Sequence, residues 1–136
     1  YRNDLVALLL EKKADLTIGR DGFLAQHVAA TAGNVKGLEL LLAAGADANA
    51  QSKDGLTPLH MGIGKPEMVE LLLSKGAKVN LKTSQGRTAL DILLRDKEQA
   101  KANNQGGDWA LRLEKSEKLL LEKGAKSGKD LEANAP

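Results

Sequence analysis

The sequence contains no cysteine and hardly any aromatic residues. Without cysteine the chain can form no disulfide, offers no thiolate nucleophile and has no cysteine ligand for a metal. Aromatic residues make up 2% of the chain and are limited to Tyr1, Phe23 and Trp109. A hydrophobic core must therefore be built almost entirely from leucine, alanine and valine, which suits layers of packed helices.

Long hydrophobic runs and a strong net charge are also missing. No apolar stretch approaches the ~20 residues that a membrane-spanning helix needs. The 20 basic and 18 acidic side chains give a formal net charge of +2, and the basic residues form no stripe with interleaved aromatics. We therefore expect neither nucleic-acid binding nor a membrane span.

The chain of 136 residues suits a single domain, and it starts at Tyr1 rather than at a methionine. We take this start to indicate a processed or trimmed product. The lack of cysteine is compatible with the cytoplasm and with an oxidising compartment. A periplasmic and a cytoplasmic location therefore both stay open.

Residues 54–78, DGLTPLHMGIGKPEMVELLLSKGAK, predict two short helices separated by a turn. Thr57 is a good N-cap, and Pro58 suits the first helical position, where a missing N–H costs nothing. Pro66 opens a second helix, and Gly76 supplies a left-handed stop. The unit reads as turn, helix, turn, helix and stop.

The same signals recur along the chain at intervals of about 30 residues, a period typical of stacked repeats. An Asp-Gly or Gln-Gly pair opens each unit, and three consecutive leucines followed by a Gly-Ala pair close it. The opening pairs are Asp21-Gly22, Asp54-Gly55 and Gln85-Gly86, and the closing pairs are Gly45-Ala46, Gly76-Ala77 and Gly124-Ala125.

These residues resemble ankyrin repeats. The resemblance is carried by residues 54–60 (DGLTPLH), by Gly33-Asn34 ahead of residues 38–42 (LELLL), and by residues 45–49 (GADAN), and it covers about residues 4–126. It implies an all-α fold, an ankyrin-repeat solenoid of stacked antiparallel helix pairs with projecting β-hairpin-like fingers.

We expect one ankyrin repeat domain over residues 1–126 and a flexible polar tail over residues 127–136. Residues 1–15 read as a half repeat that holds only a second helix. Three complete repeats follow at about residues 20–49, 53–80 and 84–126, and the last carries an insertion between its helices at about residues 95–108. We number these repeats two, three and four.

Two departures from the repeat pattern predict local differences. In repeat two, Leu24 stands where a threonine is expected, so the first helix should lack a hydroxyl cap. In repeat four, Asp91 takes the histidine position, and the insertion predicts that both helices are longer than their counterparts. We expect Asp108 to cap the second of them, from Trp109 to Lys123.

Two motifs resemble chemical sites but are better explained by the repeat. The resemblance implies that His27 and His60 hydrogen-bond the turn and the neighbouring repeat, and do not bind a metal or act as a base. Residues 62–65 (GIGK) look like a phosphate loop, yet they lack its spacing and the strand that should precede it. No serine, cysteine or metal-ligand constellation remains. We predict no catalytic residue, cofactor or metal.

The resemblance places partner-binding residues on the fingers and on the inner face of the first helices. Phe23 is either an interface anchor or packs on its own hairpin. Trp109 either packs the insertion onto the stack or is exposed for a partner. The candidate residues are Arg20, Asp21, Phe23, Lys53, Asp54, Leu56, Gln85, Arg87 and Trp109, with Gln51, Lys82 and Ser84 beside them.

We therefore predict a monomeric, non-enzymatic protein–protein interaction module. A narrower hypothesis is a small bacterial inhibitor, self-protection or regulatory protein that sequesters an enzyme partner. The alternative is an excised segment of a larger ankyrin scaffold or adaptor. An enzymatic function would need residues that the sequence does not show.

Overall fold

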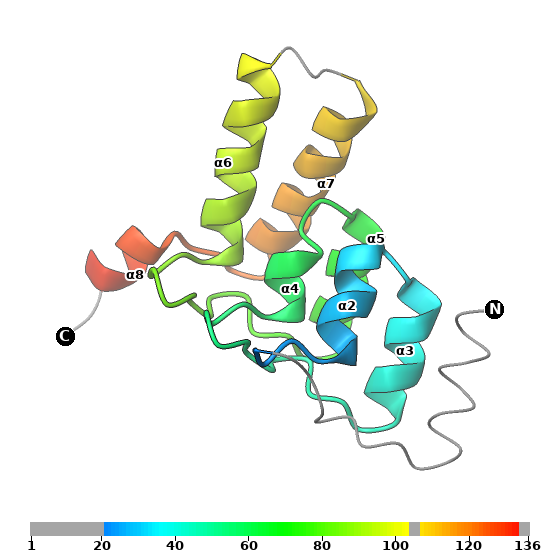
Figure 1. The fold of residues 1–136 in the computed structure, drawn as a ribbon. Coiled ribbons are helices and arrows are strands. Elements are labelled where there is room, and N and C mark those ends of the chain that lie inside the picture. The colour runs from blue at the N-terminus through cyan, green and yellow to red at the C-terminus, as the bar shows by residue number, and fades with distance from the viewer. Residues whose placement is uncertain (1–20, 104–106, 134–136) are drawn as a thin grey trace.

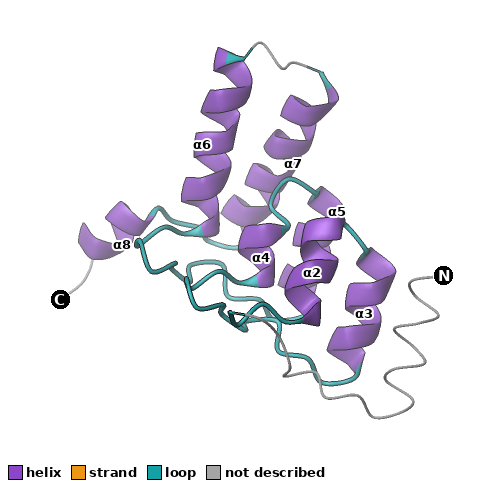
Figure 2. Cartoon of the chain, in the orientation of Figure 1, coloured by secondary structure: helices purple, strands orange, loops and turns teal. Residues whose placement is uncertain are grey.

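The structure is a computed structural model, and it describes residues 21–103 and 107–133. In these residues the chain forms seven helices and no strand, as Figure 1 and Figure 2 show. The all-α expectation is therefore confirmed. The predicted half repeat at residues 1–15 and the candidate Arg20 lie outside the described residues. The helices are α2 (Ala25–Ala32), α3 (Val35–Ala43), α4 (Pro58–Met61), α5 (Pro66–Ser74), α6 (Ala89–Ala102), α7 (Asp108–Glu122) and α8 (Gly128–Ala133).

Helices α2 to α7 form three consecutive pairs that stack side by side. The first helices make one layer, in which α4 contacts both α2 and α6, and the second helices make another, in which α5 contacts both α3 and α7. The long connections between pairs lie together at one end of the first helices (Figure 2). In the part of the chain that the structure describes, no helix is long and apolar enough to cross a membrane.

The predicted start and stop signals act as expected in repeat three. The Thr57 hydroxyl accepts a hydrogen bond from the backbone N–H of His60, and Pro58 occupies the first turn of α4. The turn at residues 62–65 separates α4 from α5, and beyond α5 Gly76 has a φ of 88°, a left-handed conformation that favours glycine. Leu24 precedes α2 without a side-chain cap, as predicted.

Two asparagines join each helix pair to the next. Asn49 donates to the carbonyl of Gly76 at 3.2 Å and accepts from the N–H of Lys78 at 2.7 Å. Asn80 repeats both bonds one repeat later, donating to the Gly124 carbonyl at 3.2 Å and accepting from the Lys126 N–H at 2.7 Å. Each side chain thus satisfies backbone groups just past the end of the following second helix.

The fingers are joined in the same repeating way. The backbone N–H of Lys53 donates to the carbonyl of Asp21 at 2.8 Å, and the N–H of Ser84 donates to the carbonyl of Asp54 at 2.8 Å. Gln51 adds a link, since its amide donates to the carbonyl of Lys82 at 3.1 Å. Neighbouring fingers therefore form a continuous, hydrogen-bonded layer.

The hydrophobic core runs through all three helix pairs and is built from leucine, as the shortage of aromatics predicts. Its fully buried side chains come from both layers of helices. The largest apolar ones are Leu38, Leu59, Met68, Leu72, Leu93, Leu113 and Leu120.

Repeat four has the predicted longer helices. Its α6 has 14 residues and its α7 has 15, against 4 and 9 in α4 and α5 of repeat three. Figure 1 shows both extending beyond the rest of the stack. An ion pair between Lys97 and Glu117, both largely buried, joins the two helices.

The prediction that Asp108 caps α7 is wrong by one residue. Gly107 takes the cap position, with a φ of 80°, and Asp108 is the first helical residue. Gly107 supplies the sharp turn, and the Asp108 carboxylate lies in the first helical turn, where the helix dipole favours a negative charge. There it pairs with Arg112 at 2.6 Å.

The segment predicted as a tail contains helix α8, which the sequence analysis missed. The Ser127 hydroxyl accepts from the N–H of Asp130 at 3.0 Å, so Ser127 acts as an N-cap. Gly128 donates its N–H to Asp91 at 2.8 Å, and the Thr88 hydroxyl donates to the Lys126 carbonyl at 2.8 Å. These bonds hold the start of α8 against α6.

Candidate protein-binding surface

One position of each first helix bonds back to the turn that precedes it. His27, His60 and Asp91 occupy this position, and each accepts a hydrogen bond from the backbone N–H three residues earlier. The three positions are therefore structurally equivalent, as the repeat spacing predicts. The bonds run from Leu24 to His27 Nδ1 at 3.1 Å, from Thr57 to His60 Nδ1 at 3.1 Å, and from Thr88 to Asp91 Oδ2 at 2.9 Å.

The other ring nitrogen of His27 reaches the next repeat. Because Nδ1 accepts a bond from Leu24, Nε2 carries the proton, and it lies 2.9 Å from the Leu56 carbonyl, to which it donates. The role implied by the resemblance, a bond to the turn and to the neighbouring repeat, is thus present in His27. Among the described residues, no cluster of His, Cys, Asp and Glu could hold a metal ion.

His60 makes the turn bond but lacks the second one. Its Nε2 is buried and has no hydrogen-bond partner within the described part of the chain. Burial lowers the pKa of His60 below its ordinary value of 6.5, while the nearby carbonyls of Arg87 and Leu81 act in the opposite direction. The imidazole therefore stays neutral in the folded protein at physiological pH.

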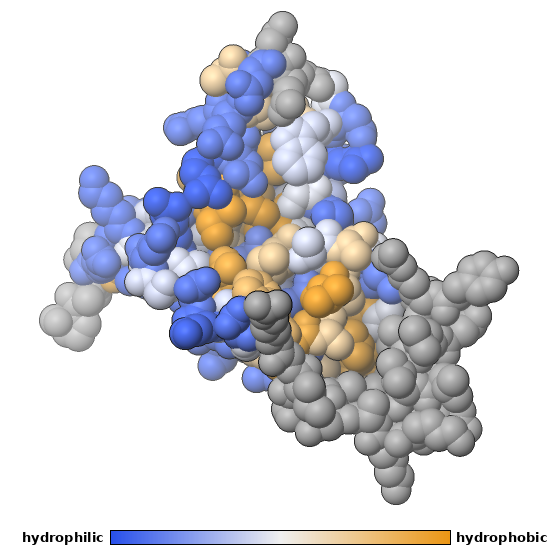
Figure 3. All heavy atoms as spheres, viewed as in Figure 1, coloured by the Kyte–Doolittle hydropathy of each residue, from blue (hydrophilic) through white to orange (hydrophobic). Residues whose placement is uncertain are grey.

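The residue after this position faces the inner side of the stack in each first helix. These residues are Val28, Met61 and Ile92; Val28 is 62% exposed and the other two are half-buried. With Phe23 and Leu56, which lie at the bases of two fingers, they make up what we call the inner strip. In Figure 3, hydrophobic side chains gather over α2 and α4 and at the base of α6.

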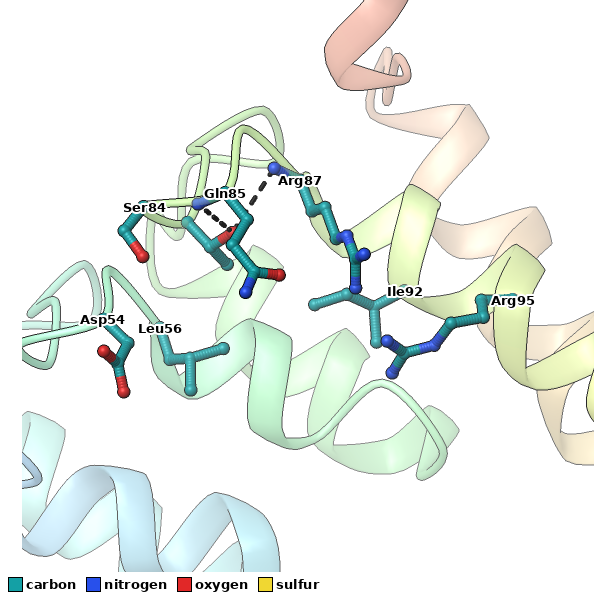
Figure 4. A pocket seen from close by; sticks show the side chains of 8 residues that line it. Asp54, Leu56, Ser84, Gln85, Arg87, Ile92 and Arg95 are labelled. Atoms are coloured by element: carbon teal, nitrogen blue, oxygen red, sulfur yellow. Dashed lines mark hydrogen bonds between the residues drawn. The ribbon is translucent and has the colours of Figure 1, made fainter.

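A hollow of about 330 Å³ lies at one end of the inner strip, where the fingers of repeats three and four meet α6. It brings together four of the predicted binding residues, Asp54, Leu56, Gln85 and Arg87, and also Ser84 beside them (Figure 4). Thr83, Ile92 and Arg95 complete the lining.

Thr83, Ile92 and Arg95 were not among the binding residues predicted from the sequence. Ile92 could have been found because it follows Asp91, which holds the histidine position. Arg95 lies three residues beyond Ile92, so both share one face of a helix. The predicted lengthening of α6 was the available signal for Arg95.

The finger of repeat four is held in shape by Thr83. Its hydroxyl accepts hydrogen bonds from the N–H groups of Gln85 and Arg87, each at 3.3 Å, and these are the dashed lines of Figure 4. The backbone of Thr83 also donates to the Arg87 carbonyl at 2.9 Å. Gly86 closes the turn with a φ of 75°. This preformed loop presents Gln85 and Arg87 at the rim.

The charges of the hollow are separated by its apolar floor. The guanidinium groups of Arg87 and Arg95 both point toward Ile92, and Asp54 lies on the far side of Leu56 (Figure 4). In the described residues Arg87 forms no ion pair. Arg95 pairs with the adjacent Asp96, at 3.7 Å, and its side chain is 51% exposed. The hollow thus has a basic side and an acidic side.

Comparison with protein families identifies this arrangement. The family described as ankyrin repeats, in three copies, matches residues 27–130. The chain belongs to the ankyrin repeat family. Members of this family are non-enzymatic modules that generally mediate protein–protein interactions. Among curated proteins, none matches this chain.

The remaining candidates of this ankyrin protein lie outside the hollow. Phe23 packs edge-on against the ring of His27 in α2, with centroids 5.6 Å apart. This contact is not with its own hairpin, so its role as an interface anchor stays a prediction. Asp21 and Lys53 are exposed on their fingers. The Gln51 amide is occupied by backbone carbonyls, including that of Gly55 at 3.2 Å.

Trp109 packs the insertion onto the ankyrin stack. A Cβ placed on Gly64 would lie 2.7 Å from Cη2 of Trp109, so the indole lies against the turn between α4 and α5. The side chain is still 38% exposed. Of the two alternatives weighed for Trp109, packing is the one that this contact matches.

Proposed function

We propose that this ankyrin protein binds a protein partner through the hollow and the adjoining inner strip, without catalysing a reaction. The observation that carries the proposal is the preformed hollow itself. It combines an apolar floor with charged side chains that have few partners of their own, at the junction of two fingers and a first helix. Arginine is, with tryptophan and tyrosine, one of the side chains that contribute most to binding where a partner removes it from water.

The lining of the hollow favours binding over catalysis. Its hydroxyl groups belong to Thr83 and Ser84, and none of the eight lining residues is a histidine, cysteine or lysine that could act as a base or nucleophile beside them. Asp54 is separated from the two arginines by the apolar floor. The hollow therefore offers recognition chemistry, and Asp54 is the one lining residue that could act as a base.

The hollow alone is too small for a stable protein interface. Specific complexes bury about 600–1,000 Å² on each partner. The inner strip extends the surface along α2 and α4, where Val28 is 62% exposed. We therefore propose that the partner engages the hollow with its tightest contacts and covers the strip with the rest.

A capture experiment with paired variants tests this function. Arg87→Ala and Leu56→Ser alter the hollow, whereas Lys115→Ala and Lys118→Ala alter exposed residues on α7. We expect proteins captured from native lysate to be lost with the first pair and kept with the second, while circular dichroism shows unchanged helix content. Equal capture by all four variants would contradict the proposal.

The narrower hypothesis of an inhibitor that sequesters an enzyme stays a prediction. Its test is the activity of a captured enzyme with and without added ankyrin protein. Inhibition that disappears with Arg87→Ala would support it. The predicted monomeric state is checked separately by light scattering after size-exclusion chromatography.

A further inference from the structure

We infer that the hollow takes an extended peptide segment in which an apolar side chain stands next to a carboxylate. The inference rests on the proposed function and deepens it, because it names the chemistry of the contact. It follows from three features: two converging arginines, an apolar floor, and N–H groups of the repeat-four finger that already donate within the stack.

The two arginines favour an anion in the space between them. Arg87 comes from the finger and Arg95 from α6, and both guanidinium groups point toward Ile92 (Figure 4). Like charges that converge repel each other unless an opposite charge lies between them. A carboxylate matches the planar fork of a guanidinium and can accept two parallel hydrogen bonds from it.

The second arginine is present only because α6 is long. Asp91 and His60 are equivalent, so Arg95 corresponds to Gly64, which lies in the turn after α4 has ended. In repeat four the helix continues to Ala102 and carries Arg95 on the face that holds Ile92. The insertion of this repeat thus adds a positive charge to the surface at a place where repeat three has none.

The floor accepts an apolar side chain beside that carboxylate. Leu56 and Ile92 are half-buried and line the hollow from two successive repeats. The volume of about 330 Å³ suits one or two side chains and no larger body. Asp54, on the opposite side, repels a second carboxylate there and so fixes the direction of the segment.

We expect recognition to rely on side chains because the N–H groups of the repeat-four finger are already occupied. The N–H of Ser84 bonds to the carbonyl of Asp54, and the N–H groups of Gln85 and Arg87 bond to the Thr83 hydroxyl. A peptide cannot pair with these groups as an added strand without breaking bonds within the stack. An acidic and apolar side-chain motif fits the charges and the floor of the hollow.

Selection from a random peptide library displayed on phage tests the inference directly. The probes are linear peptides selected against the immobilised full chain. We expect enrichment of Asp or Glu beside Leu, Ile or Phe, and binding of the selected peptides weakened about tenfold or more by Arg87→Glu with Arg95→Glu. The same double variant should in turn select peptides rich in lysine and arginine.

A matched control uses Lys115→Glu with Lys118→Glu, which changes the net charge equally at exposed positions of α7. This control should leave binding within about twofold. The inference is overturned if no peptide is selected, if the selected peptides lack acidic residues, or if both double variants weaken binding equally. Selected peptides without acidic residues that still lose binding on Leu56→Ser would overturn the inference and leave the proposed function standing.

Discussion

Repeats three and four begin alike and end differently. In both, a threonine caps the first helix and a residue three positions later bonds back to the cap, through His60 in one and Asp91 in the other. Repeat three then turns at Gly62, whereas α6 of repeat four runs on to Ala102. The shared start fixes the stacking, and the altered end changes the surface.

The difference shows where this chain can vary without losing its fold. Repeat three uses its glycines for close packing: Gly62 lies under Met68, and Gly64 lies under Trp109. Repeat four replaces that close turn with a longer pair of helices that carries charged side chains, including Arg95. Repeat three therefore provides a close-packed surface for α7 of repeat four, and repeat four supplies most of the residues that line the hollow.

The largest expected effect comes from buried leucines that occupy the same place in the two repeats. Leu72 in α5 and Leu120 in α7 are both 0% exposed. Changing either to alanine leaves a cavity, so we expect a loss of about 2–5 kcal/mol in the free energy of unfolding, measured in urea.

Leu121→Ala is the control for these cavities, because Leu121 is 52% exposed. It should change the free energy of unfolding by less than about 0.5 kcal/mol. Both buried variants should unfold in one transition. A separate transition for Leu120→Ala alone would mean that repeat four folds independently of repeat three, and would contradict a core shared by the two repeats.

A smaller effect is expected where repeat three meets the insertion of repeat four. Gly64→Ala places a Cβ 2.7 Å from Cη2 of Trp109, and overpacking of this kind costs about 1–3 kcal/mol. The single tryptophan reports the change through its fluorescence. In a Trp109→Ala background the cost of Gly64→Ala should shrink, which a double-mutant cycle measures. An unchanged cost would show that the indole does not rest on this turn.

Asn49 and Asn80 should contribute equally to the free energy of unfolding. Asn49→Ala and Asn80→Ala each remove two hydrogen bonds of matching length, 3.2 and 2.7 Å. Because these groups are exposed and water can replace the side chain, we expect each change to cost about 1 kcal/mol. Unfolding in urea is the measurement. A cost at one joint that is several times the other would show that the joints are not equivalent.

The smallest effect is a pH dependence that arises from His60 in repeat three. Burial lowers the pKa of His60 in the folded protein, so the unfolded chain binds more protons as the pH falls. Stability from this group is complete above the ordinary pKa of 6.5 and is lost as the pH falls below it. The free energy of unfolding, compared at neutral and mildly acidic pH, should fall less in His60→Asn than in the parent. An equal fall would contradict this assignment.

Much of the fold could be predicted from the sequence because local signals and packing agree. Thr57 with Pro58, and the glycine at 76, mark helix ends through a capping hydroxyl, a missing N–H and backbone freedom. The missed helix α8 had a signal as well, since Ser127 and Asp130 have the spacing of a capping box. The polar composition of the segment concealed it.

The candidate surface was harder to predict because it depends on which distant side chains meet. Finger positions such as Asp54 and Arg87 could be assigned by repeat spacing. Arg95 joins them only through the face that α6 presents, and Phe23 lies outside the hollow, in the inner strip, where its ring packs on His27. Periodicity gives the register of a residue along the stack, whereas contacts across repeats depend on side-chain direction.

The hollow lies across the boundary between two repeats, so its width depends on how the stack bends. Asp54 and Leu56 belong to one repeat, and Arg87 and Ile92 belong to the next. Since each repeat of a solenoid contacts only its neighbours, bending is shared among the joints. The width of the hollow must therefore follow the curvature of the stack. A peptide segment bound there as we propose would contact both repeats and so restrict bending at this joint.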